Sequence, residues 1–229
     1  MKRIGLLGGM SWESSALYYS LINEEVRERL GGLHSASCIM SSVDFADIER
    51  FQHHGDWAAA GQLLADEARR LESAGAEILV LCTNTMHKVA DAIEAAISIP
   101  FLHLADVTAK AVLASGINTV GLLGTRFTME ESFHIQRLAS HGLTVITPDA
   151  EDRAAVNAVI YDELVLGQIL PESRRRYQDI IDRLGQKGAQ GIILGCTEIE
   201  LLIRPEDTPL AVFATTRLHA HAAVTTALA

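Results

Sequence analysis

Residues 78–88 read ILVLCTNTMHK and residues 192–199 read IILGCTEI, so two distant parts of the chain carry similar short stretches. Each is an aliphatic run that ends in thiol, hydroxyl, amide or carboxylate side chains. An uninterrupted apolar run of this kind is typical of a strand that is buried on both faces of a parallel sheet. Ligands of such sheets bind at the carboxyl ends of the strands. The two stretches therefore predict proton-carrying side chains at the ligand-binding edge of an α/β fold.

The similarity between the two halves of the chain extends beyond these stretches. Residues 4–9, 79–83 and 100–105 are each followed by a similar segment, at offsets of 116, 113 and 109 residues. Three matches in one order and at nearly constant offsets indicate an internal duplication. Strands alternate with helices throughout, which favours parallel sheets joined by right-handed crossovers.

The duplication predicts the domain organisation. We expect an α/β fold of two lobes related by a pseudo-twofold axis, each a four-stranded parallel sheet flanked by helices. The N-terminal lobe would comprise residues 1–105 and 214–229, and the C-terminal lobe residues 106–213, with the active site in the cleft between them. No linker rich in Gly, Ser and Pro separates the halves, so we expect the lobes to pack closely.

The composition narrows the functional classes. The 229 residues carry a formal net charge of −10, whereas nucleic-acid-binding proteins usually present a basic face, so no nucleic-acid partner is expected. No apolar stretch is long enough to span a bilayer, and the N-terminal apolar run of residues 4–7 is too short for a signal peptide. Three cysteines cannot all pair, which favours a reduced, cytoplasmic protein. His53 and His54 have no partner at ligand spacing, so no metal site is expected, and His219 is expected on a surface helix.

The predicted strand ends favour a site with two acid–base groups. A pseudo-twofold axis would bring equivalent strand ends to opposite sides of one carbon, where removing and returning a proton inverts a stereocentre. Fixed donors can hold the developing carbanion without a metal or cofactor. A thiol suits the proton transfer because its free pKa, about 8.5, is readily lowered by its surroundings. The expected donors are the backbone N–H groups after Gly8 and Gly124 and the side chains of Asn84, Thr85, Thr125, Thr128 and Thr197.

Three motifs resemble the aspartate/glutamate racemase family: GGMSWES at residues 8–14, CTNTMHK at 82–88 and GCTEI at 195–199. The resemblance runs along essentially the whole chain. It is closest to the bacterial branch of L-aspartate/glutamate-preferring or broad-specificity amino-acid racemases. It implies two α/β lobes, racemisation of a small amino-acid substrate without pyridoxal phosphate or another cofactor, and usually a homodimer.

The resemblance also implies the catalytic pair. Cys196 matches the second base of the family. The first base of the family is a cysteine before Asn-Thr, and at that place this sequence has Thr83, with Cys82 one position earlier. Because neighbouring side chains of a strand point to opposite faces, we expect Thr83 in the cleft and Cys82 in the core. By resemblance, Met10, Gln52, Thr83, Asn84 and Thr85 would contact the substrate. Together with the donors above, the expected substrate-binding residues are Met10, Gln52, Asn84, Thr85, Thr125, Thr128, Thr197 and Glu198.

Departures from the family pattern change the expected activity. An alcohol accepts a proton far less readily than a thiol, so Thr83 predicts a weaker or one-sided racemase. Val165 stands where some members carry lysine and Ala214 where aspartate is common, which favours a looser substrate range that includes uncharged amino acids. Two alternatives stay open. One is a related cysteine-dependent isomerase or decarboxylase, against which Thr83 speaks, and the other is a catalytically idle amino-acid sensor.

Overall fold

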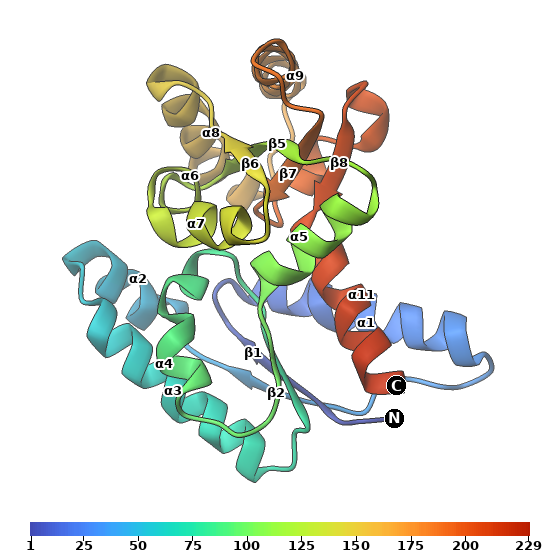
Figure 1. The fold of residues 1–229 in the computed structure, drawn as a ribbon. Helices are drawn as coiled ribbons and strands as arrows, with labels where there is room; N and C mark the ends of the chain where they lie inside the picture. Colours follow the sequence, from blue (N-terminus) through green and yellow to red (C-terminus); the bar gives the residue numbers. More distant parts are fainter. The chain divides into compact units, whose positions relative to one another are not determined.

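The computed structural model describes residues 1–229, which divide into two compact units (Figure 1). Unit 1 comprises Met1–Leu104 and His219–Ala229, and unit 2 comprises Ala105–Leu218. Each unit contains a four-stranded parallel sheet flanked by helices, which confirms the predicted α/β fold class. None of the helices combines the length and the apolar character that crossing a membrane requires.

The sheet of unit 1 has the strand order β2-β1-β3-β4, and all of its pairings are parallel. Its strands are β1 (Ile4–Gly8), β2 (Cys38–Ser42), β3 (Ile78–Leu81) and β4 (Phe101–Leu102). Its helices are α1 (Trp12–Leu30), α2 (Phe45–His54), α3 (Trp57–Ser73), the 3-10 helix η1 (Thr85–Val89) and α4 (Ala90–Glu94). The last helix, α11 (Thr215–Leu228), begins in unit 2 and ends in unit 1.

The alternation of apolar side chains along β1 and β3 gives each face of the unit 1 sheet its own core. Ile4 and Val80 pack with α1 and α11, in a cluster that also contains Tyr18. Leu7 and Leu81 point to the other face and pack with α2, α3 and α4. Both faces of these strands are therefore buried, as the uninterrupted apolar pattern predicts.

The sheet of unit 2 repeats this topology with the order β6-β5-β7-β8. Its strands are β5 (Thr119–Gly124), β6 (Thr144–Ile146), β7 (Gly191–Gly195) and β8 (Ala211–Ala214). Its helices are α5 (Leu104–Ala114), α6 (Arg126–Glu130), α7 (Ser132–Ser140), α8 (Ala150–Asp162), η2 (Leu164–Leu166), α9 (Pro171–Gln186), α10 (Ile199–Leu202) and η3 (Pro205–Asp207). The common strand order supports the internal duplication.

The strand registers correct one of the predicted repeat offsets. Strands β5 and β7 pair as β1 and β3 do, at the predicted offsets of 116 and 113 residues. Leu79 pairs with Phe101, whereas its equivalent Ile192 pairs with Val212, so β4 and β8 correspond at 111 residues rather than 109. The predicted offset was wrong because these edge strands are short and carry little pattern for an alignment.

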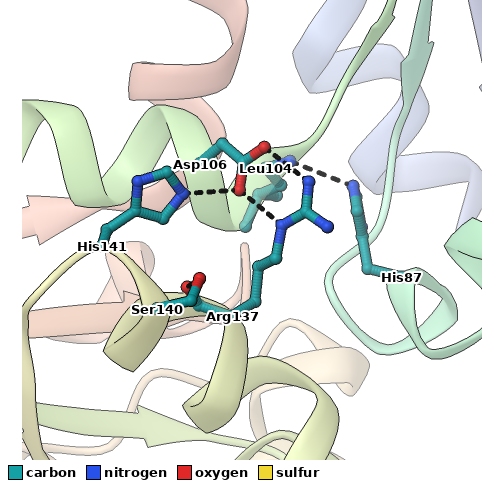
Figure 2. Close-up of polar contacts among 6 residues, drawn as sticks. All are labelled: His87, Leu104, Asp106, Arg137, Ser140 and His141. Atoms are coloured by element: carbon teal, nitrogen blue, oxygen red, sulfur yellow. Dashed lines mark hydrogen bonds and ion pairs between the residues drawn. The ribbon is translucent and has the colours of Figure 1, made fainter.

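Helices α5 and α7 of unit 2 are joined by a group of charged side chains (Figure 2). Arg137 donates hydrogen bonds from Nε and Nη2 to the two carboxylate oxygens of Asp106, at 2.6 and 2.7 Å. His141 Nε2 lies 2.8 Å from Asp106 Oδ1. The three side chains are partly exposed, so we expect the bidentate pair to contribute about 1 kcal/mol or less to stability.

His219 lies in the core of unit 1, so its predicted position on a helix surface was wrong. The side chain is fully buried on α11, with Nε2 2.7 Å from the Leu102 carbonyl oxygen and Nδ1 2.9 Å from the Tyr18 hydroxyl. A carbonyl oxygen can only accept, so Nε2 carries the proton, Nδ1 accepts from Tyr18, and the imidazole is neutral. Burial lowers the pKa of His219 to about 4, although the bond to Leu102 acts in the opposite direction.

This neutral histidine predicts a loss of stability in mild acid. Above pH 6.5 the ring is neutral in both the folded and the unfolded chain and adds no pH dependence. Below pH 6.5 the unfolded chain binds a proton that the folded chain does not bind until near pH 4, so the free energy of unfolding falls in this window. Between pH 7 and pH 5 this single group should cost about 2 kcal/mol.

Urea denaturation of the wild type and of His219→Gln at both pH values measures this contribution. Glutamine can keep one hydrogen bond but has no proton to gain in this range. We expect the variant to be less stable at pH 7 and to lose about 2 kcal/mol less than the wild type on going to pH 5. Equal losses in the two proteins would contradict the neutral, buried state of His219.

Candidate active site

The candidate residues of unit 1 gather where the chain leaves β3. Cys82 donates its N–H to the Leu7 carbonyl at 2.8 Å, and its own carbonyl accepts a hydrogen bond from Ser14 Oγ at 2.9 Å. The Cys82 side chain is fully buried in the apolar cluster between the sheet and α1, and burial raises the pKa of its thiol. Cys82 is therefore a core thiol, as expected, while Thr83 and Asn84 retain 8% and 7% of their exposure.

His87 holds the segment that carries Thr83. Its Nδ1 lies 2.8 Å from the Thr83 carbonyl oxygen, and its Nε2 accepts a hydrogen bond from the Leu104 N–H at 3.2 Å (Figure 2). These partners require the tautomer with the proton on Nδ1, because the carbonyl can only accept and the amide can only donate. The neutral ring thus links the end of β3 to the residue where α5 begins.

Asn84 presents an acceptor that lacks a hydrogen-bond partner. Its Oδ1 atom is buried and receives no hydrogen bond from the protein. A buried carbonyl oxygen left in this state costs about 1–3 kcal/mol, so a bound donor at this position would recover that energy. The adjacent Thr85 is the first residue of η1 and remains partly exposed.

Met10 and Gln52 reach the same end of unit 1 through Met86. Gln52 on α2 donates from Nε2 to the Met86 sulfur at 3.1 Å. Met10, which is 6% exposed, belongs to the apolar cluster that contains Met86. The structure therefore brings Met10, Gln52 and the segment after β3 together within unit 1.

The turn after β1 differs from its predicted role as a source of backbone donors. Gly9 has a φ of +91°, and a Cβ atom there would lie 2.2 Å from the Val43 carbonyl oxygen, so only glycine fits. Its N–H donates to Ser15 Oγ at 2.8 Å, and that hydroxyl donates in turn to the Ser11 carbonyl at 2.9 Å. The Gly9 amide is therefore already bonded, and the expectation that it serves a ligand was wrong.

The candidate residues of unit 2 gather at the carboxyl end of β7. The Cys196 thiol donates to Glu198 Oε2 at 2.9 Å, and the Thr197 hydroxyl donates to the same oxygen at 2.7 Å. Burial raises the pKa of the Cys196 thiol well above its usual value, and the carboxylate of Glu198 raises it further. The backbone N–H groups of Glu198 and Ile199 act in the opposite direction. The thiol therefore holds its proton at neutral pH and can act as an acid.

Two threonines of unit 2 lie beside the same strand end. Thr125 Oγ1 and Thr128 Oγ1 are 3.3 Å apart, and both side chains are buried. A Cβ atom added to Gly124 or to Gly195 would lie 3.0–3.1 Å from the Thr128 side chain. Glycines at the paired ends of β5 and β7 thus let Thr128 approach the residue before Cys196.

Thr83 and Cys196 occupy equivalent positions in the two units. In unit 1, β1 and β3 pair Leu7 with Leu81, and Thr83 follows two residues later. In unit 2, the corresponding pairing ends with Leu194, and Cys196 also follows two residues later. An alcohol and a thiol therefore stand at the same point of two repeated folds.

The candidate residues supply hydroxyl, thiol, amide and carboxylate groups. The structure contains no group of three or more His, Cys, Asp or Glu side chains arranged to hold a metal ion. All three cysteines are free thiols. The arrangement can hold an anionic or zwitterionic ligand and exchange protons with it.

Comparison with protein families assigns the chain. The family model described as Asp/Glu/Hydantoin racemase matches residues 7–223. The chain belongs to the Asp/Glu/Hydantoin racemase family. Racemases are isomerases, and those of this family act without pyridoxal phosphate. The resemblance inferred from the three sequence motifs is confirmed.

Solved structures and a curated relative agree with this family membership. The chain matches the crystal structure of a candidate Asp/Glu racemase from Yersinia pestis with 55% identity and a TM-score of 0.96, covering 100% of both chains. It matches an aspartate racemase homologue from Pyrococcus horikoshii with 32% identity and a TM-score of 0.90, again over 100% of both chains. It is 24% identical to the broad-specificity amino-acid racemase RacX of Bacillus subtilis, over 99% of this chain and 98% of that protein.

Some contacts of this family member were not predicted from the sequence. Glu198 was expected to contact substrate, yet its carboxylate accepts hydrogen bonds from Cys196 and Thr197. A carboxylate two residues after a candidate catalytic cysteine is a signal that could have suggested this pair. The hydrogen bonds of His87 depend on a partner 17 residues away, and no local pattern announces them.

Proposed function

We propose that the protein is a cofactor-independent amino-acid racemase in which Cys196 and Thr83 act on opposite faces of one Cα. The observation that carries this proposal is the equivalence of the two residues at the ends of β3 and β7. Repeated folds that end in proton-carrying groups at the same position are suited to a reaction that has two mirror-related halves.

In the proposed reaction one group removes the Cα proton and the other supplies a new one. When the Cys196 thiolate takes the proton, an S–H bond forms and the electron pair stays on Cα, delocalised into the carboxylate. The Thr83 hydroxyl then gives its proton to the opposite face of Cα. In the reverse direction the Cys196 thiol, which holds its proton in the resting enzyme, is the donor.

The unequal acidities of thiol and alcohol limit the expected rate. Enantiomers have equal free energies in water, so kcat/KM must be the same in both directions for any racemase. A poor base at Thr83 would slow inversion of both enantiomers. The inequality of the two bases would appear as unequal exchange of the Cα hydrogen with solvent.

Asn84 supports an amino-acid substrate. Its buried, unpartnered Oδ1 suits the α-ammonium group, which carries three donors. Met10, Gln52 and Thr85 on unit 1, and Thr125, Thr128 and Thr197 on unit 2, are the other proposed contacts. Aspartate and glutamate are the first substrates to test, with uncharged amino acids next because Val165 and Ala214 replace family residues. A homodimer and a cytoplasmic location stay predictions.

Chiral chromatography tests the proposed function directly. The purified protein, without added pyridoxal phosphate or metal, should convert L-aspartate or L-glutamate into its D-enantiomer and should also run the reverse conversion. Uncharged amino acids should be tested in parallel to define the range. If no amino acid is inverted and no Cα hydrogen exchanges with heavy water, the protein is a binding protein and the proposal fails.

A further inference from the structure

The thiol of Cys196 and the carboxylate of Glu198 form a close pair in unit 2. The Sγ–Oε2 distance is 2.9 Å, and Thr197 Oγ1 approaches the same oxygen to 2.7 Å. Cys196 is 8% exposed, so the pair is largely removed from water. One carboxylate oxygen therefore receives a thiol proton within hydrogen-bond distance while a neighbouring hydroxyl fixes its position.

We propose that Cys196 and Glu198 share one proton, and that Glu198 accepts it whenever Cys196 has to act as a base. This inference rests on the proposed racemase function. In the step, the S–H bond breaks, an O–H bond forms on Glu198, and the sulfur becomes a thiolate. The pair carries one negative charge before and after, and no proton is exchanged with water.

The surroundings of the pair favour such a transfer. The backbone N–H groups of Glu198 and Ile199 stabilise the thiolate form of Cys196. Glu200, on α10, places a second carboxylate nearby, which favours proton uptake by Glu198. Arg217 on α11 pairs with Glu200 at 2.9 Å and partly offsets that charge. Tyr177 on α9 is the other titratable group close to the sulfur, and burial, followed by the charge of Cys196, raises its pKa, so it stays neutral.

A shared proton has a distinctive pH signature. If the thiolate arises by transfer within the pair, its population does not depend on pH while the pair holds one proton. If it arises by loss of a proton to water, its population rises about tenfold per pH unit below the thiol pKa. The pH profile of the Cys196-dependent step separates these cases, and a residue that only binds substrate would leave the profile unchanged.

Cα–H exchange in heavy water between pH 6 and 8 measures this step, using the enantiomer whose exchange depends on Cys196. The wild type should give a flat profile. Glu198→Gln should be at least about tenfold slower at pH 6.5 and should rise about tenfold per pH unit. The matched control Glu200→Gln removes a neighbouring carboxylate that does not bond to Cys196, and should keep the flat profile. A flat profile in Glu198→Gln would overturn the shared proton.

Alkylation of Cys196 by iodoacetamide gives a second test that needs no catalysis. Peptide mass spectrometry separates Cys196 from Cys38 and Cys82. The pH midpoint of the Cys196 reaction should fall by about one unit or more in Glu198→Gln, because the carboxylate that retains the thiol proton is lost, and should hardly move in Glu200→Gln. Coincident midpoints would overturn the inference. If the wild type shows no Cα exchange, the proposed function fails, and this alkylation result still decides whether the pair shares a proton.

Discussion

Replacing Cys196 with alanine should lower racemisation of both enantiomers, and Cα–H exchange of one of them, by about 10³-fold. A positioned acid–base group contributes typically 10²–10⁴-fold to a rate, and alanine can neither take nor give a proton. Loss of the side chain also leaves Glu198 and Thr197 without the thiol that now bonds to the carboxylate. Chiral chromatography follows inversion, and NMR in heavy water follows exchange of each enantiomer separately.

The other two cysteines provide matched controls for this variant. Cys38→Ala changes a half-buried thiol on β2, away from the candidate residues, and should keep activity within about twofold of the wild type. Circular dichroism should show that all variants keep the fold. Wild-type inversion and wild-type exchange of both enantiomers in Cys196→Ala would remove Cys196 from the mechanism.

Replacing Thr83 with cysteine should raise the rate of inversion by about tenfold or more. Thr83 stands where the equivalent position of unit 2 has a thiol, and a thiol yields a usable base near neutral pH whereas an alcohol does not. Cysteine lacks one methyl group of threonine, so the substitution fits the space that Thr83 occupies. The measurement is kcat/KM for both enantiomers, together with the rate of Cα–H exchange.

A cysteine introduced elsewhere separates this effect from a general effect of an added thiol. Thr144 is an exposed threonine at the start of β6, and Thr144→Cys should leave the rate within about twofold of the wild type. An unchanged rate in Thr83→Cys, with the protein folded, would count against Thr83 as an acid–base group that reaches the substrate.

The parts of the fold that the sequence predicts are those with strong local patterns. The aliphatic runs of β1, β3, β5 and β7 are buried on both faces, so their composition alone identifies them. Helix α2 was expected only as a polar stretch, because Ile48 is its one fully buried side chain and the apolar pattern is weak. The position of His219 depends on partners at Tyr18 and Leu102, far away in the sequence, so composition could not reveal its burial.

The site was predicted unevenly for a similar reason. Motifs located Thr83 and Cys196, and the strand registers then establish that the two positions are equivalent. The contact between Cys196 and Glu198 depends on the conformation of the turn after β7, which residue types do not specify. The hydrogen bond from Gly9 to Ser15 likewise depends on the backbone of the turn, and it removes a donor that composition alone would count as available.

The most direct test of two bases acting on one carbon is the fate of the Cα hydrogen during the first turnovers in heavy water. If Cys196 and Thr83 act from opposite faces, the newly formed enantiomer carries deuterium at Cα while the remaining substrate keeps its hydrogen. Product that retains the original hydrogen would mean that a single group removes and returns the same proton, and would contradict the account.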